Sequence, residues 1–319
     1  MKLKNRIICS AILTFSLAIS LSTGSIVKAE NNKSNISTSS GSVIQKISDD
    51  VQIDWTKNII KVTGMGAPPD RGNNAQKRLM AIRAAKADAF RQLLESIQGV
   101  HVSSETVVRD FVTESDVIKT KVEGLVKGAE QVGEPRYMSD GSVEVDMQIK
   151  LFGENKEIPV PKDKEPANTS AEPGNDSLAS AIMTEEIKRR ETDSVPNTKI
   201  KPETTNETYT ALILDCKGLG VQPAMSPAIF DSDGGEVYVG ALPIDPDYVI
   251  NEGIVSYATG VSEAKKNERA GDNPLVIKAK KVSGLFKADM TITNDDAKKL
   301  IGAENKGQFL KDFKVIMVI

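Results

Sequence analysis

The chain has 319 residues, of which 39% are hydrophobic and 27% are charged, and its formal net charge at pH 7 is −3. Residues 1–29 carry four lysine or arginine residues and no acid, so a chain without them has a net charge of −7. The acidic net charge and the 4% content of aromatic residues argue against the basic face and the stacking rings on which nucleic-acid binding depends, although local basic patches can exist in a chain of negative net charge. The sequence therefore predicts no nucleic-acid partner.

The N-terminus has the pattern of a secretory signal. Three cations within the first six residues precede an apolar run at 7–21, and Val-Lys-Ala at 27–29 places small residues where a signal peptidase cleaves. We expect residues 1–29 to be removed; a retained anchor is the alternative, although the run is short for a membrane span. Cys9 opens the apolar run rather than closing it, so lipidation is not predicted. The expected location is the periplasm or cell envelope, without a transmembrane span.

Residues 30–50 are polar and low in complexity, which predicts a disordered spacer. Two β-rich runs then flank residues 56–58 and predict a hairpin. Residues 74–98 predict an amphipathic helix, with further alanines that would let a second element approach closely. The expected apolar stripe consists of Ala75, Leu79, Ile82, Ala89, Phe90, Leu93 and Ile97.

Three segments after this helix alternate apolar and polar residues, which predicts strands at 100–112, 117–132 and 142–152. In the last segment the odd-numbered residues from 143 to 151 are apolar and the even-numbered ones polar, as in a sheet with one covered face. A long helix on an antiparallel sheet gives an α+β domain over residues 51–153.

The second half divides into a linker and a further domain. Residues 154–207 are rich in Pro, Glu, Lys and Thr and predict a disordered linker, with a helix-like island at 177–190 that is either docked on a partner or solvated. Residues 208–319 predict a second α+β domain. Its expected elements are a strand at 208–216, a hairpin around the turn at 231–235, a helix from 245 to 264, strands at 273–284 and 288–293, a short helix capped by Asn294 and closed by Gly302, and a buried strand at 309–319.

A search for chemistry predicts no catalytic, cofactor-binding or metal-ligating residue. His101, the only histidine, lies in a predicted strand without a matching nucleophile and is interpreted as structural. The pair Gly64 and Gly66 lacks the third glycine of a dinucleotide fingerprint. Asp231 and Asp233 resemble the start of a calcium loop, but the later ligands are missing, which favours a turn. Once the leader is removed, Cys216 is the only thiol, so neither an intramolecular disulfide nor a cysteine metal cluster is possible.

Residues 53–153 resemble the LPP20 family of bacterial envelope proteins and the N-terminal domain of the flagellar assembly protein T. The residues that carry this resemblance are Ala81, Arg83, Ala84, Ala85, Asp88, Ala89, Leu93, Gly99, Val100, Gly124 and Gly128. The resemblance implies a helix on a small antiparallel sheet, as in dodecin, but without a flavin role. Family members are often lipoproteins, and this chain lacks the lipidation cysteine. Residues 211–240 resemble a segment found behind LPP20 domains in other exported proteins.

These observations predict a non-enzymatic exported envelope protein. It would act as a structural or assembly module that contacts itself, as a homo-oligomer, or proteins of the envelope or flagellar base, through an open sheet face or edge strands. The alternative is a ligand- or metal-binding protein or an enzyme, with its site in the C-terminal domain around Asp215, Asp231 and Asp233.

Overall fold

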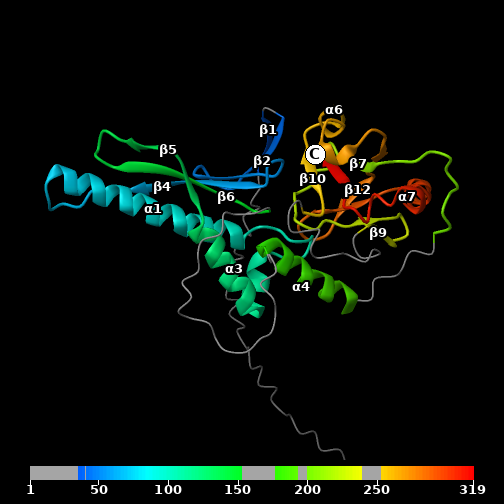
Figure 1. The fold of residues 1–319 in the computed structure, drawn as a ribbon, viewed down its shortest axis with the longest axis horizontal. Helices are drawn as coiled ribbons and strands as arrows, with labels where there is room; N and C mark the ends of the chain where they lie inside the picture. The colour runs from blue at the N-terminus through cyan, green and yellow to red at the C-terminus, as the bar shows by residue number, and fades with distance from the viewer. Residues whose placement is uncertain (1–34, 40, 153–176, 193–199, 239–252) are drawn as a thin grey trace, which may run out of the picture. The chain divides into compact units, whose positions relative to one another are not determined.

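The computed structural model describes residues 35–39, 41–152, 177–192, 200–238 and 253–319 (Figure 1). The described residues all belong to one compact unit. The described residues form helices and three sheets, which agrees with the predicted α+β class.

A six-stranded antiparallel sheet occupies the N-terminal half of this unit (Figure 1). Its strands, in spatial order, are β1 (Asn35–Ser39), β2 (Ser42–Lys46), β3 (Val51–Asp54), β4 (Ile59–Gly66), β6 (Val143–Lys150) and β5 (Glu130–Tyr137). The predicted hairpin is confirmed as β3 and β4, and the predicted strand at 142–152 is confirmed as β6. The odd-numbered apolar residues of β6 are buried, as the alternation requires.

One long helix, α1 (Asn74–Gln98), packs against β4 and β6 and has the predicted bounds. It begins with a capping box, in which the Asn73 side chain accepts from the Gln76 N–H and the Gln76 side chain accepts from the Asn73 N–H. It ends before Gly99. The predicted apolar stripe is partly wrong, because Ala75 and Leu79 are exposed, whereas Ala81 and Ala85, which lie outside that stripe, are buried. The buried residues of α1 are Ala81, Ala85, Ala89, Leu93 and Ile97.

Two helices stand where strands were predicted at 100–112 and 117–132, so both predictions are wrong over these helices, and only residues 130–132 are in a strand, at the start of β5. They are α2 (Val108–Glu114) and α3 (Asp116–Lys127). Their buried residues are three or four positions apart, which is the helical period. Packing of these helices against each other and against α1 outweighs the strand preference of their β-branched residues. The buried residues are Val108, Phe111, Ile118, Val122 and Val126.

The predicted spacer and linker both contain folded elements. Strands β1 and β2 lie within residues 30–50, so disorder is the wrong prediction for residues 35–39 and 42–46. In the predicted linker, α4 (Leu178–Thr192) packs against α2 and α3, and its Ile182 is fully buried. The helix-like island is therefore docked on its own chain. Residues 154–176 and 193–199 of the linker lie outside the described residues.

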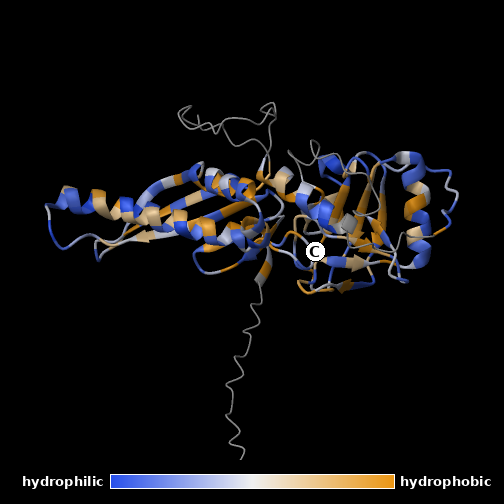
Figure 2. Cartoon of the chain, turned by 90° about the horizontal axis from the view of Figure 1, so that it is seen from below, coloured by the Kyte–Doolittle hydropathy of each residue, from blue (hydrophilic) through white to orange (hydrophobic). Residues whose placement is uncertain are grey.

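The C-terminal half contains two four-stranded sheets, and the strands near the C-terminus are mostly hydrophobic (Figure 2). The first sheet is parallel, in the order β10 (Ser256–Ala258), β14 (Val315–Val318), β7 (Ala211–Asp215) and β11 (Pro274–Lys278). The second sheet is mixed, in the order β12 (Lys281–Ser283), β13 (Asp289–Thr291), β8 (Ile229–Phe230) and β9 (Glu236–Tyr238). The remaining elements are α6 (Val261–Ala264), the 3-10 helix η1 (Glu268–Ala270) and α7 (Asn294–Gly307).

Most of the predicted C-terminal elements are confirmed. Strand β14 is buried in the sheet, and β8 and β9 form the hairpin around the turn at 231–235. The helix predicted for 245–264 is wrong where β10 lies, and residues 239–252 are outside the described part. Helix α7 is capped by Thr293, whose hydroxyl accepts from the Asp296 N–H, and it continues beyond Gly302. Asn294 is its first residue rather than its cap.

Candidate interaction surface

The face of the N-terminal sheet that points away from α1 is called the open face. In β4 and β6, residues alternate between the side covered by α1 and this open side. Cross-strand pairs on the open face are Lys61 with Gln148, Thr63 with Asp146, and Met65 with Glu144. The open face is therefore lined by charged and polar side chains, as its sequence alternation indicates.

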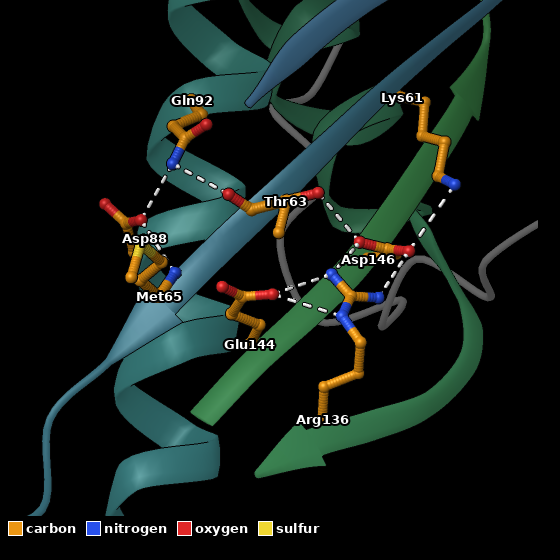
Figure 3. A network of polar contacts seen from close by, with 8 residues as sticks. All are labelled: Lys61, Thr63, Met65, Asp88, Gln92, Arg136, Glu144 and Asp146. Atoms are coloured by element: carbon orange, nitrogen blue, oxygen red, sulfur yellow. Dashed lines mark hydrogen bonds and ion pairs between the residues drawn. The ribbon is translucent and has the colours of Figure 1, made fainter. Parts of the chain in front are cut away.

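A network of polar contacts connects three strands on the open face (Figure 3). Asp146 on β6 accepts hydrogen bonds from both terminal nitrogens of Arg136, at 2.8 and 2.9 Å, and from the Thr63 hydroxyl at 2.8 Å. The Lys61 ammonium of β4 lies 3.4 Å from the same carboxylate. Arg136 also lies 3.0 Å from the Glu144 carboxylate. Strands β4, β6 and β5 are thus held together by side chains as well as by backbone bonds.

The electrostatics of this network favour the ionised form of Asp146. The hydrogen bond from Arg136, supported by those from Thr63 and by Lys61, holds the pKa of Asp146 well below its usual range, although burial opposes the shift. The carboxylates of Asp146 and Glu144 raise the pKa of Arg136 above its usual value. A carboxylate with such a low pKa is a poor proton acceptor. The arrangement therefore braces the sheet and offers no general base.

Side chains of α1 cover the free edge of β4. Strand β3 pairs with β4 only as far as Val62. Beyond this point the Gln92 amide donates to the Thr63 carbonyl at 3.2 Å, and the Met65 N–H donates to the Asp88 carboxylate at 3.1 Å (Figure 3). Burial raises the pKa of Asp88, but hydrogen bonds from Arg91, the Met65 N–H and Gln92 outweigh this effect and lower it. The free backbone groups are thereby blocked from pairing with another strand.

The two outer edges of this sheet differ. Along β5 the pairing with β6 shifts register between Val132 and Arg136, where Gly133 has a φ of 73° and Pro135 has no N–H to donate. Along β1 the pairing with β2 continues without a shift over all five residues, Asn-Ile-Ser-Thr-Ser, none of which is charged or proline. Edge β5 is therefore protected against strand addition, whereas edge β1 carries neither a register shift nor a proline among the residues that the structure describes.

The glycine pair that resembles a nucleotide fingerprint has a packing role. A Cβ atom on Gly64 would lie 2.2 Å from the Ala85 carbonyl oxygen, and one on Gly66 would lie 2.1 Å from the Ala81 carbonyl oxygen. No side chain fits at either position, because the backbones of β4 and α1 are in close contact. The small residues of α1 and the glycines of β4 together permit this approach.

His101 and Cys216 are both largely enclosed by packing. The imidazole of His101 stacks on the Phe286 ring with 4.4 Å between centroids, and its backbone carbonyl accepts from the Met225 N–H. Burial lowers the pKa of His101. Cys216 is a free, buried thiol whose pKa is raised by burial. Neither group has the electropositive, accessible surroundings of a reactive side chain.

The three aspartates of the alternative site are distributed over two sheets. Asp215 ends β7 of the parallel sheet, whereas Asp231 and Asp233 belong to the turn after β8 of the mixed sheet. The Asp231 carboxylate accepts from the N–H groups of Asp233 and Gly235, both at 2.8 Å, so it stabilises the turn. In the part of the chain that the structure describes, no group of three His, Cys, Asp or Glu residues is arranged to hold a metal ion.

Sequence reasoning missed the network around Asp146, because it assigned residues 117–132 to a strand and left β5 unrecognised. The available signal was the turn at Asp140-Gly141, which places an antiparallel strand directly before β6. Sequence reasoning also expected no membrane-spanning helix, and none of the described helices is long and apolar enough for one.

Comparison with known proteins relates the C-terminal half to one family. Residues 211–319, from β7 to the end of the chain, are similar to the family described as the second domain of Treponema pallidum Tp0624. No curated protein matches the chain.

Proposed function

We propose that this chain is a non-enzymatic, exported protein of the cell envelope that assembles with copies of itself and with envelope or flagellar-base proteins. The secretory pattern of residues 1–29 and the LPP20 resemblance of residues 53–153 support this proposal. The similarity of residues 211–319 to a domain of a Treponema protein is compatible with it.

The observation that carries the proposal is the selective protection of strand edges. The free part of β4 is covered by Asp88 and Gln92, and β5 is interrupted by a bulge and Pro135. Edge β1 has no such device, and in the described chain no strand pairs with its outer side. An unprotected edge adds a further strand through backbone hydrogen bonds. Antiparallel pairing of β1 with β1 of a second copy would be isologous, which is the commonest symmetry of a protein dimer.

The test is the molar mass of the chain from residue 30 onward, measured by light scattering after size-exclusion chromatography. Variants Ser37→Pro and Thr38→Pro each remove one backbone donor from β1, and neighbouring donors point to opposite edges of a strand. We therefore expect the native chain to form an oligomer. Only the variant that removes a backbone N–H pointing away from β2 should be monomeric. A native chain that is monomeric at all concentrations would refute assembly through β1.

Localisation is tested separately by fractionation of native cells. We expect the protein in the envelope fraction, and enrichment with purified flagellar bases would identify that partner. Recovery only as a freely soluble exported species would contradict the envelope assignment.

A further inference from the structure

The end of the N-terminal half where α1 begins has a distinct surface, which we call the outer end. It consists of the end of β4, the loop at 67–73, the first turns of α1 and the turn between β5 and β6. Two contacts hold these segments together. A Cβ atom on Gly141 would lie 3.4 Å from Pro68, and the Arg78 guanidinium lies 4.8 Å from the centre of the Tyr137 ring. The loop at 67–73 and the start of α1 therefore lie close to the end of β5 and to the turn that follows it.

Four exposed large apolar side chains belong to the segments of the outer end, two on α1, one at the end of β5 and one on the open face of β4. Met65, Leu79, Met80 and Tyr137 are each about half exposed, between 49% and 53%. They are four of the eight exposed large apolar residues in the described chain. Hydrophilic residues (blue) and hydrophobic residues (orange) alternate along α1 as far as this end (Figure 2). Single exposed apolar residues are normal, but a cluster indicates a contact surface.

The outer end is also positively charged within an acidic protein. Its four cations, Arg71, Lys77, Arg78 and Arg83, exceed its two acids, Asp70 and Asp140. No carboxylate of the described residues forms an ion pair with any of these four cations. The whole chain, by contrast, has a net charge of −3. The apolar side chains are thus accompanied by Arg71, Lys77 and Arg83, which could bind an anionic partner, and by Arg78, which lies over the Tyr137 ring.

We propose that the outer end docks on a lipid bilayer surface that contains anionic lipids. This inference rests on the proposed envelope location. Half-exposed Leu, Met and Tyr side chains would enter the boundary between headgroups and acyl chains, and the cations would bind lipid phosphates. Tyrosine has a polar tip and an apolar ring, which suits it to that boundary. Two copies of the outer end would repel each other through their excess of positive charge, which disfavours a second copy as the occupant.

The experiment measures sedimentation of the chain from residue 30 onward with vesicles. One set contains equal parts of phosphatidylglycerol and phosphatidylcholine, and the other contains phosphatidylcholine alone. We expect binding to the first set, and affinity lower by roughly tenfold or more in the double variant Arg71→Glu and Arg83→Glu. The double variant Leu79→Ser and Met80→Ser should lose a similar factor.

Matched controls use exposed residues elsewhere. Lys119→Glu with Lys201→Glu changes the net charge equally, and Val117→Ser with Leu285→Ser removes apolar side chains that are 62% and 76% exposed. Both controls should bind like the native chain. Circular dichroism shows whether each variant is folded.

Three results would overturn the lipid proposal. The chain could fail to bind vesicles, it could bind both vesicle sets equally, or the variants and their controls could lose affinity equally. Self-association that is abolished by the Leu79 and Met80 changes, without vesicle binding, would show that the outer end is a contact between copies and would also overturn it. Assembly through β1 and envelope fractionation are measured separately, so the proposed function can survive either result.

Discussion

Replacement of Gly64 by alanine tests the close contact between β4 and α1. The added Cβ would lie 2.2 Å from the Ala85 carbonyl oxygen and 2.6 Å from the Ala89 backbone nitrogen. Carbon atoms in favourable contact are about 3.5 to 4 Å from their neighbours. Because both neighbours belong to the helix backbone, no side-chain rotation relieves the clash, and α1 has to move away from the sheet.

The expected cost follows from this movement. Overpacking of a well-packed core costs about 1 to 3 kcal/mol and occasionally more. The clash in Gly64→Ala involves main-chain atoms and separates the fully buried Ala81, Ala85 and Ala89 from β4. We therefore expect the free energy of unfolding to fall by about 3 kcal/mol, at the upper end of that range.

The assay is urea unfolding followed by fluorescence. Trp55 is the only tryptophan of the chain, is 1% exposed, and lies in the same half as Gly64, so its emission reports the affected core. The matched control is Gly124→Ala in α3, where an added Cβ meets nothing within 4 Å. This control should stabilise the protein by about 0.5 to 1 kcal/mol, because alanine favours a helix over glycine.

A change of less than about 0.5 kcal/mol in Gly64→Ala would refute the close-contact argument, since surface substitutions have effects of that size. The double variant Gly64→Ala with Ala89→Gly separates side-chain from backbone clashes. It removes the Ala89 Cβ, which is 2.7 Å from the added atom, but leaves both backbone contacts. Substantial recovery of stability in the double variant would contradict a backbone clash.

Three further predictions concern other parts of the fold. The pKa of Asp146 is lower in the folded than in the unfolded chain, so unfolding takes up a proton in acid. The free energy of unfolding of the native chain should therefore fall below about pH 4, and that of Asp146→Asn should fall less over the same pH range. Urea titrations at several pH values measure both. Cys216 should react with a thiol reagent only as fast as the chain unfolds; rapid modification of native protein would contradict its burial. Ile182→Ala should cost about 2 to 4 kcal/mol in urea unfolding if α4 is docked, whereas exposed Lys188→Ala should change stability by less than about 0.5 kcal/mol; equal effects would indicate a solvated helix.

The sequence predicts α1 and β6 well because each has a long segment with one period. Residues 74–98 contain few helix breakers, and the alternation from Val143 to Leu151 is unbroken. The apolar stripe of α1 was less predictable. Hydrophobicity favours Leu79 over alanine, but the glycines of β4 can approach only a helix surface of small residues. Whether leucine or alanine faces the sheet therefore depends on the glycines of β4, which belong to a different segment of the sequence.

The wrong strand predictions in α2 and α3 have a related cause. Their segments are rich in valine and threonine, which prefer strands when considered alone. Ile118, Val122 and Val126 are nevertheless four residues apart, and their burial against neighbouring helices decides the conformation. With β5 misplaced, the contact of Arg136 with Asp146 could not be predicted, because it requires the register between two strands.

The exposure of the outer end follows from the lengths of two elements that the sequence does predict. The 25 residues of α1 span about 37 Å at 1.5 Å per residue, whereas the eight residues of β4 span about 26 Å. The difference of roughly 11 Å corresponds to about seven helical residues. The first seven residues of α1 are 74–80, and the buried series begins at Ala81. Leu79 and Met80 are thus exposed because the helix extends beyond its sheet, and this overhanging turn has a capping box at Asn73 but no covering layer of its own.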